Sequence, residues 1–170
     1  MLLATTVLAA TLTACTPASA PTPTPTPTGF ASEEEAFAAA EATYRAYVDA
    51  LNQVDLSDPA TFEPVYALTT GEANATERKG LSDYHANGLS VSGETEITLL
   101  QGSAWKPETD QVLLDTCIDV SRIDVVDSNG ISQVSPDRPD VQTLRVTLTG
   151  SSGDDLKIEA IDSRDGGPDC

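Results

Sequence analysis

Three neighbouring residues carry the side chains most suited to proton transfer near neutral pH. Asp83, Tyr84 and His85 place an acid, a phenol and an imidazole together, and His85 is the only histidine of the chain. General acid and base catalysis uses such groups when a partner orients the imidazole. Residues two apart do not share a helical face, so Asp83 cannot orient the ring. We therefore expect a solvated helix end here and assign no catalytic residue.

A second group of polar side chains consists of aspartates, the oxygen ligands that calcium prefers. They are Asp115, Asp119, Asp124 and Asp127. The run from Asp127 to Gly130 lacks the distant glutamate of an EF-hand loop. Asp115, Cys117 and Asp119 alternate with apolar residues, which favours an outward polar face of a strand. We expect neither a metal site nor a cofactor.

The charge balance excludes one class of partner. The 170 residues carry a formal net charge of −18. The phosphate backbone of a nucleic acid is also negatively charged, so it would be repelled by this chain. Proteins that bind nucleic acids offer basic surfaces instead. Residues 1–28 contain no charged side chain, whereas the remainder has the mixed composition of a globular domain.

The N-terminus has the pattern of an export signal. The apolar run from Leu2 to Leu12 is too short to cross a bilayer as a helix and is typical of a signal-peptide core. It ends in Leu12-Thr13-Ala14-Cys15, which resembles the lipobox of bacterial lipoproteins. The resemblance implies cleavage after Ala14, a diacylglyceryl group on Cys15 and attachment to the extracytoplasmic face of the cell membrane. The alternative is an ordinary cleaved signal that leaves Cys15 lost or free.

Residues 15–28 are expected to form a tether. Proline and threonine alternate from Pro21 to Thr28, and proline lacks an amide donor and fixes φ. An extended stretch of this length spans roughly 40 Å. We therefore divide the chain into a signal peptide over 1–14, a tether over 15–28 and one folded domain over 29–170.

If Cys15 carries lipid, Cys117 and Cys170 remain as an even pair. In an exported protein such a pair is normally a disulfide. A zinc site is the alternative, but His85 lacks the spacing of known zinc ligands. We expect a bridge that pins the C-terminal tail to the outer face of a strand.

The first half of the folded part has helical patterns. Ser32 and Glu35 form a capping box before an apolar face that recurs at three- and four-residue steps. The residues of this face are Phe37, Ala40, Tyr44, Tyr47, Val48, Leu51 and Val54. Asp58-Pro59 opens a short second helix that Pro64 interrupts or restarts. Thr69 and Glu72 predict a further capping box, before a helix that stops at Asn87-Gly88.

The second half alternates with the period of strands. Four strands are expected around Ile97, Leu114–Val120, Leu144–Leu148 and Leu156–Ala160, in an antiparallel sheet. The apolar phase slips near Ser121-Arg122, which predicts a β-bulge. Asp127–Gly130 supplies the residues of a tight turn.

Helices followed by a meander with a long, bulged strand indicate an α+β fold with N-terminal helices on a curved antiparallel sheet. This order, with the run Leu114–Ser121, resembles the nuclear transport factor 2-like, SnoaL-like family. The resemblance implies a cone-shaped domain whose enzymes place a carboxylate or histidine inside the cone. No residue of this chain matches those positions. We expect the aromatic helix face to plug the cone, and a ligand pocket at Tyr44, Tyr47 and Tyr66.

The sequence predicts a lipid-anchored, extracytoplasmic domain with a non-catalytic binding or scaffold role. Its expected partner is a small apolar ligand or a protein at the cell surface. The alternative is a cone-fold enzyme of the isomerase, dehydratase or hydrolase type.

Overall fold

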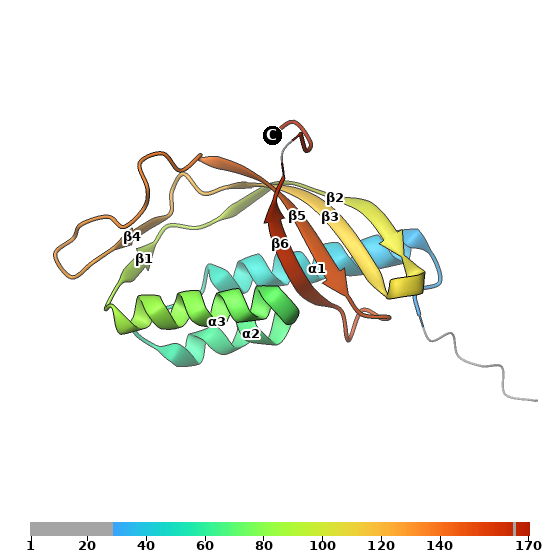
Figure 1. Ribbon diagram of the computed structural model, residues 1–170, viewed down its shortest axis with the longest axis horizontal. Helices are drawn as coiled ribbons and strands as arrows, with labels where there is room; N and C mark the ends of the chain where they lie inside the picture. The colour runs from blue at the N-terminus through green and yellow to red at the C-terminus, as the bar shows by residue number, and fades with distance from the viewer. Residues whose placement is uncertain (1–28, 165) are drawn as a thin grey trace, which may run out of the picture.

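The computed structural model describes residues 29–164 and 166–170. Three α-helices pack against one face of a curved antiparallel sheet, which confirms the predicted α+β, cone-like fold (Figure 1). Cys15, the expected signal peptide and the expected tether lie outside the described residues. In the described part of the chain, no helix is both long and apolar enough to cross a membrane.

Helix α1 (Glu33–Leu51) begins at the predicted capping box. The backbone N–H of Glu35 donates to Ser32 Oγ at 3.2 Å, and Glu35 Oε2 accepts from the backbone N–H of Ala31 at 2.8 Å. Both bonds satisfy amides that have no partner within the helix. The buried face of α1 consists of Ala36, Ala40, Tyr44, Tyr47, Val48 and Ala50.

The next helices begin where the sequence predicts, except that α3 has a different N-cap residue. The 3₁₀ helix η1 (Pro59–Phe62) is capped by Asp58, and α2 (Glu63–Leu68) restarts at Pro64. Helix α3 (Gly71–Ala86) has Thr70 as its N-cap. The predicted capping box at Thr69 is therefore wrong. The Thr69 hydroxyl is buried and donates to the Val65 carbonyl of the preceding helix at 3.1 Å, so it cannot cap α3.

The main sheet has four strands in the order β2-β3-β5-β6, all antiparallel. Their bounds are β2 (Glu96–Lys106), β3 (Gln111–Asp119), β5 (Val141–Thr149) and β6 (Lys157–Ser163). The short 3₁₀ helix η2 (Pro107–Thr109) connects β2 to β3. Register shifts interrupt the β2–β3 pairing, and shifts of this kind bend a sheet. The four predicted strands are confirmed.

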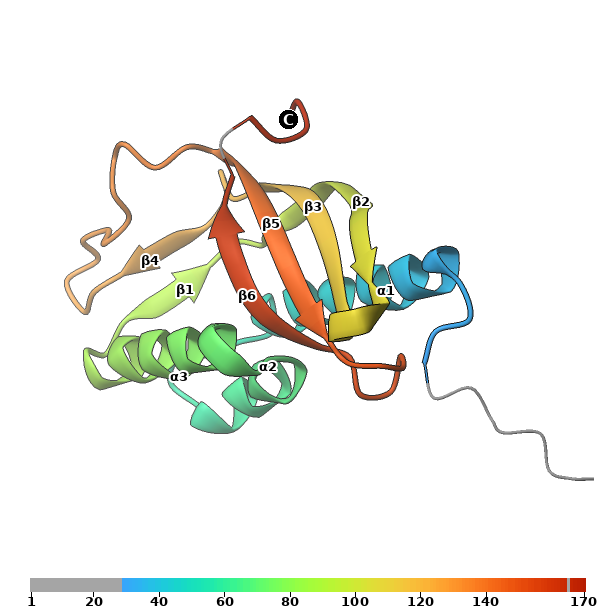
Figure 2. The same ribbon diagram turned by 45° about the vertical axis from the view of Figure 1, so that its right-hand side comes forward.

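The predicted bulge near Ser121 is instead a break between two strands. Strand β3 ends at Asp119, whose side chain accepts from the Ser121 backbone N–H at 2.8 Å. Strand β4 (Asp124–Val126) then pairs with β1 (Ser90–Ser92) in a separate two-stranded sheet. We call β1, β4 and residues 127–140 the arm. Figure 2 shows the arm extending beyond the main sheet, on the side where α3 ends.

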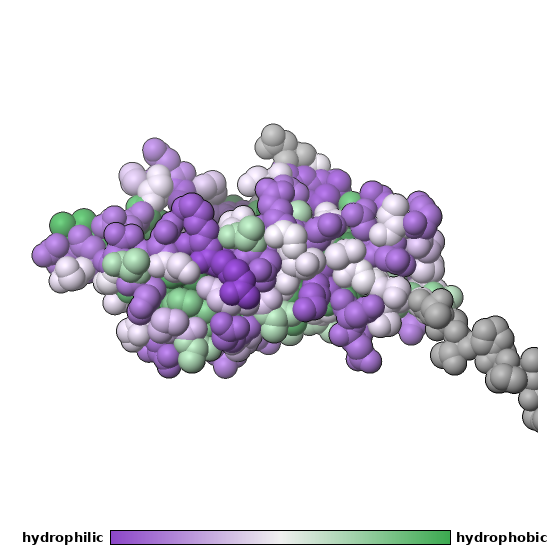
Figure 3. All heavy atoms as spheres, turned by 60° about the horizontal axis from the view of Figure 1, so that its bottom comes forward, coloured by the Kyte–Doolittle hydropathy of each residue, from purple (hydrophilic) through white to green (hydrophobic). Residues whose placement is uncertain are grey.

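The core lies between the helices and the concave face of the main sheet. Tyr44, Leu114, Leu148 and Ile158 are almost completely buried there. Gly102 on β2 permits this close packing, since an added Cβ would lie 2.3 Å from the ring of Phe37. The outer surface of the helices is mostly hydrophilic with small apolar patches (Figure 3).

The opposite face of the sheet carries a buried ion pair. Asp115 on β3 points away from the helices, as expected, but it is only 5% exposed. The prediction of a plain outward polar face is therefore wrong. Arg145 on β5 donates to Asp115 Oδ1 at 3.0 Å, and Arg164 pairs with the same carboxylate. Two guanidinium groups thus cover the aspartate and compensate its charge.

The predicted disulfide is confirmed. Cys117 and Cys170 are bonded, with their Cα atoms 5.7 Å apart and a sequence separation of 53 residues. Cys117 is 1% exposed on β3, two residues from Asp115. The bridge therefore holds the C-terminal tail beside the Asp115 ion pair.

We expect Cys170→Ser to lower the free energy of unfolding. A loop of this length predicts a loss of about 4 kcal/mol from chain entropy. Denaturant unfolding of the oxidised protein measures it, with Ser152→Ala in an exposed loop as the control. Two reactive thiols in the unfolded, unreduced wild-type protein would contradict the bridge.

Candidate functional site

A cleft of about 550 Å³ separates the arm from the helices. One wall comes from the end of α1, the loop after it and α3. The other comes from the arm and from the β1–β2 and β3–β4 connections. Its apolar lining comprises Leu51, Val54, Leu56, Leu81, Tyr84, Val91, Ile123, Val125 and Val134. The polar lining side chains are Asn52, Glu77, Thr95, Gln133, Ser135 and Arg138.

Local backbone geometry places the arm opposite α3. Gly93 has a φ of +84°, and a Cβ there would lie 1.9 Å from the carbonyl oxygen of Arg122. Only glycine permits this close approach. Asn52 then ties α1 to the start of β2: its side chain donates to Thr95 O at 3.0 Å and accepts from Thr95 N at 2.9 Å.

The most distinctive polar group of the cleft is a carboxyl on α3. The Tyr47 hydroxyl donates to Glu77 Oε1 at 2.5 Å. Burial raises the pKa of Glu77 above its ordinary value, and the bond from Tyr47 offsets part of that rise. Burial, followed by the nearby Glu77 charge, raises the pKa of Tyr47, so its hydroxyl remains a donor. The pair is a fixed donor and acceptor at the edge of an apolar surface.

Arg138 is the one basic side chain in the lining of the cleft, among the described residues. Its Nη2 donates to the carbonyl oxygens of Val120 and Ile123 at 2.7 and 2.9 Å. These bonds hold the break between β3 and β4 in place. Its Nε is buried and has no partner within the described part of the chain.

The three tyrosines predicted to form a ligand pocket are packed in the core. Tyr44 is 1% exposed, and burial raises its pKa to about 12. None of the three tyrosines belongs to the cleft lining. Tyr47 is connected to the cleft by its hydrogen bond to Glu77, which does line it. The ring of Tyr66 lies under Arg78, 4.1 Å from its guanidinium carbon, which is a cation–π contact.

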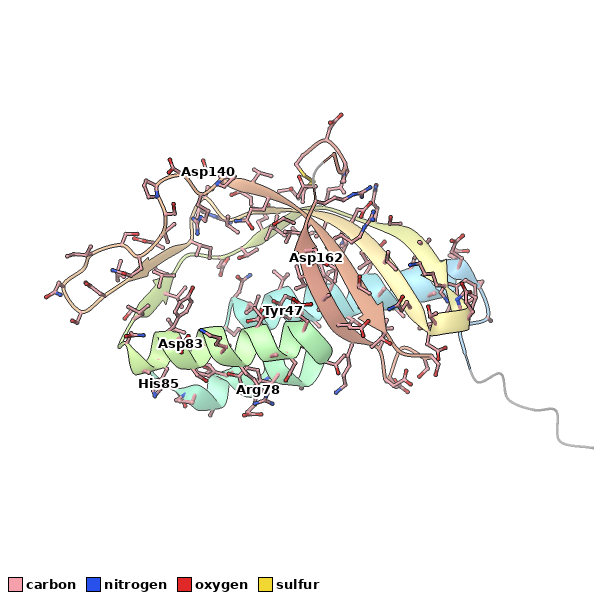
Figure 4. The ribbon with its side chains drawn as sticks, in the orientation of Figure 1. Tyr47, Arg78, Asp83, His85, Asp140 and Asp162 are labelled. Carbon is pink, nitrogen blue, oxygen red and sulfur yellow. A yellow bond between two sulfur atoms is a disulfide. The ribbon has the colours of Figure 1, made fainter. Side chains whose placement is uncertain are left out.

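Asp83 and His85 do not form a catalytic pair. Asp83 binds Lys79 at 2.6 Å, while His85 Nδ1 donates to the Leu56 carbonyl at 2.7 Å. Figure 4 shows His85 and Arg78 on the side of α3 away from the sheet, whereas Tyr47 lies between α3 and the sheet. Neither Asp83 nor His85 lines the cleft.

The aspartates considered as calcium ligands have separate partners. Asp119 accepts from Ser121, Asp124 from Ser132, and Asp127 from the amides of its own turn. In the described residues no three His, Cys, Asp or Glu side chains gather in a way that could hold a metal ion.

Sequence reasoning missed Glu77 and Arg138. A signal for Glu77 was present, because Ala73, Glu77, Leu81 and Tyr84 recur at three- and four-residue steps on one helical face. A carboxyl inside such a stripe indicates a polar group at the edge of an apolar surface. Arg138 has no such signal, since it lies in a loop with no periodic pattern.

We expect Glu77→Gln to stabilise the protein at neutral pH. A raised pKa means that the folded state holds the proton more tightly than the unfolded state, so stability falls as pH rises through the folded-state pKa. Glutamine still accepts the Tyr47 bond and does not titrate. The difference in melting temperature between variant and wild type should therefore be larger at pH 7 than at pH 4.

The matched control is Glu94→Gln, which removes an equal charge from an exposed position in the β1–β2 connection. Its effect should be small at both pH values. A difference for Glu77→Gln that grows toward pH 4 would contradict the raised pKa.

Comparison with known proteins shows a likeness in fold. No known protein family matches the chain, and no curated protein matches its sequence. The intermembrane space region of the chloroplast protein ARC6 is 13% identical, with a TM-score of 0.53 over 75% of this chain and 95% of that one. An aromatic ring hydroxylase-like protein from Novosphingobium aromaticivorans is 12% identical, with a TM-score of 0.50 over 79% and 92%. At these identities the likeness establishes the cone-like α+β fold alone.

Proposed function

We propose that this protein is a non-catalytic binding domain, lipid-anchored through Cys15 on the extracytoplasmic face of a bacterial cell membrane, whose cleft takes a small apolar molecule. The observation that carries the binding role is the apolar cleft of about 550 Å³ between the arm and the helices. Ligand sites in proteins commonly measure about 300–1,000 Å³ and combine apolar walls with a few polar groups.

The walls of the cleft have the composition that such a ligand needs. Leu81 on α3 and Val125 on β4 belong to opposite walls, and Val91 is 37% exposed on the arm. Filling the cleft removes this apolar surface from water, which is the main driving force for binding an apolar molecule.

One observation favours the alternative of a cone-fold enzyme. Glu77 has a raised pKa and lines a cleft, as a general acid often does. Among the described residues, however, Glu77 is the sole carboxyl of the lining, which contains no histidine or cysteine. A hydrolase or dehydratase needs a second group to act as base or nucleophile. The set of lining residues therefore supports a binding role.

The proposed location has independent support from cysteine chemistry. Disulfides persist in oxidising compartments outside the cytoplasm. The bond between Cys117 and Cys170 agrees with export, and export agrees with the signal-like run before Cys15.

We expect Nile red, an uncharged apolar dye, to bind in the cleft of the purified protein. Val91→Arg replaces an apolar wall residue of the cleft by a charged one and should weaken dye binding about tenfold, because an uncharged apolar dye gains no contact that offsets desolvation of the guanidinium group. Fluorescence titration measures the dissociation constant.

The matched control is Val141→Arg. Val141 is 38% exposed, close to the 37% of Val91, and lies on β5 outside the cleft lining. Absence of dye binding, or an equal loss in the two variants, would refute the small-molecule role.

We expect the mature N-terminus to be Cys15 bearing a diacylglyceryl group. Cys15→Ser should abolish membrane attachment, because two acyl chains on one residue are enough for stable anchoring. Mass spectrometry of the N-terminal peptide and fractionation of cells measure both. A mature N-terminus elsewhere, or Cys15 without lipid, would end the lipoprotein proposal.

A further inference from the structure

We propose that the cleft selects an apolar molecule that carries a protonated amine, with the ammonium group bound to the free oxygen of Glu77. This inference rests on the proposed function, because it names the chemical class of the ligand for the same cleft. It follows from the geometry of Glu77, the charges around it and the walls beside it.

The Glu77 carboxyl is held in one orientation with one oxygen available. Oε1 accepts from the Tyr47 hydroxyl, whereas Oε2 has no hydrogen-bond partner in the described part of the chain. Tyr47 is itself 4% exposed and stacks with Tyr44, with ring centroids 6.0 Å apart. The acceptor is therefore oriented by the core before any ligand arrives, which lowers the entropic cost of binding.

The charge of Glu77 is uncompensated by the described residues. The ion pairs there join Lys79 to Asp83, Arg122 to Glu96, and two arginines to Asp115, and none includes Glu77. An ammonium group would supply both an opposite charge and N–H donors, which form stronger bonds to a carboxylate than neutral donors do. The net charge of −18 also favours the approach of a cation.

The apolar body of the ligand has a surface on which to lie. Leu81 and Tyr84 follow Glu77 by four and seven residues, so the three lie along one face of α3. Val91 and Val125 are paired across the two strands of the arm and line the same cleft. A hydrocarbon chain or ring attached to the amine would contact these side chains.

The main contrary feature is Arg138. Its unpartnered Nε and its positive charge would suit a carboxylate. Two backbone carbonyls already occupy Nη2, however, so part of the charge is compensated. An anionic ligand would also leave Glu77 unpaired and would approach a strongly acidic protein. The charges therefore favour a cationic ligand over an anionic one.

Three probes with the same alkyl chain separate these cases. Octylamine is protonated at pH 7, 1-octanol is neutral and octanoate is anionic. We expect calorimetric titration of the purified protein to give at least about tenfold tighter binding for octylamine than for 1-octanol, since a charge-assisted bond replaces a neutral one. Octanoate should bind most weakly.

Two variants locate the preference. Glu77→Gln should abolish the advantage of octylamine over 1-octanol. Glu94→Gln removes an equal charge outside the cleft lining and should preserve the advantage.

The outcomes separate the two levels of the proposal. If neither Nile red nor any of the three alkyl probes binds, the proposed function fails. If the dye and 1-octanol bind but octylamine has no advantage, or octanoate binds most tightly, the amine inference fails while the binding role stands. An equal loss in Glu77→Gln and Glu94→Gln would assign the preference to the overall charge and overturn the role of Glu77.

Discussion

The structure depends on the packing of α1 against the concave face of the main sheet. Gly102 leaves room for Phe37, and this contact lets α1 approach the strands closely enough to bury Tyr44 and Tyr47. Burial fixes the Tyr47 hydroxyl, which in turn orients the Glu77 carboxyl on α3. The polar group of the cleft is thus positioned by the core through a single hydrogen bond.

The cleft itself arises from the break between β3 and β4. If β3 had continued through a bulge, the residues that form β4 would have extended the main sheet. The break instead lets β4 pair with β1 as a separate arm, and Arg138 holds the turn by bonding to Val120 and Ile123. The alternating apolar residues Ile123 and Val125, which would otherwise pack in a core, therefore line an open cleft.

The outer face of the sheet is stabilised independently of the cleft. Asp115 is compensated by Arg145 and Arg164, and the disulfide holds the tail that follows Arg164. Removal of one partner from a buried ion pair leaves an uncompensated charge, so both arginines contribute to keeping Asp115 buried. The main sheet is consequently stabilised on both faces, and the arm is joined both to the end of α3 and to strands of the main sheet.

The sequence by itself determined the elements whose signals are local. Capping residues such as Ser32 and Asp58, the alternation of four strands and the even pair of cysteines predicted the helices, the main sheet and the disulfide. Tertiary structure decided which polar groups are buried. Glu77 and Tyr47 are 30 residues apart, and Asp115 is covered by arginines 30 and 49 residues away. The burial of a side chain depends on residues that are far away in the sequence and pack against it in the fold. A local sequence pattern does not identify those residues.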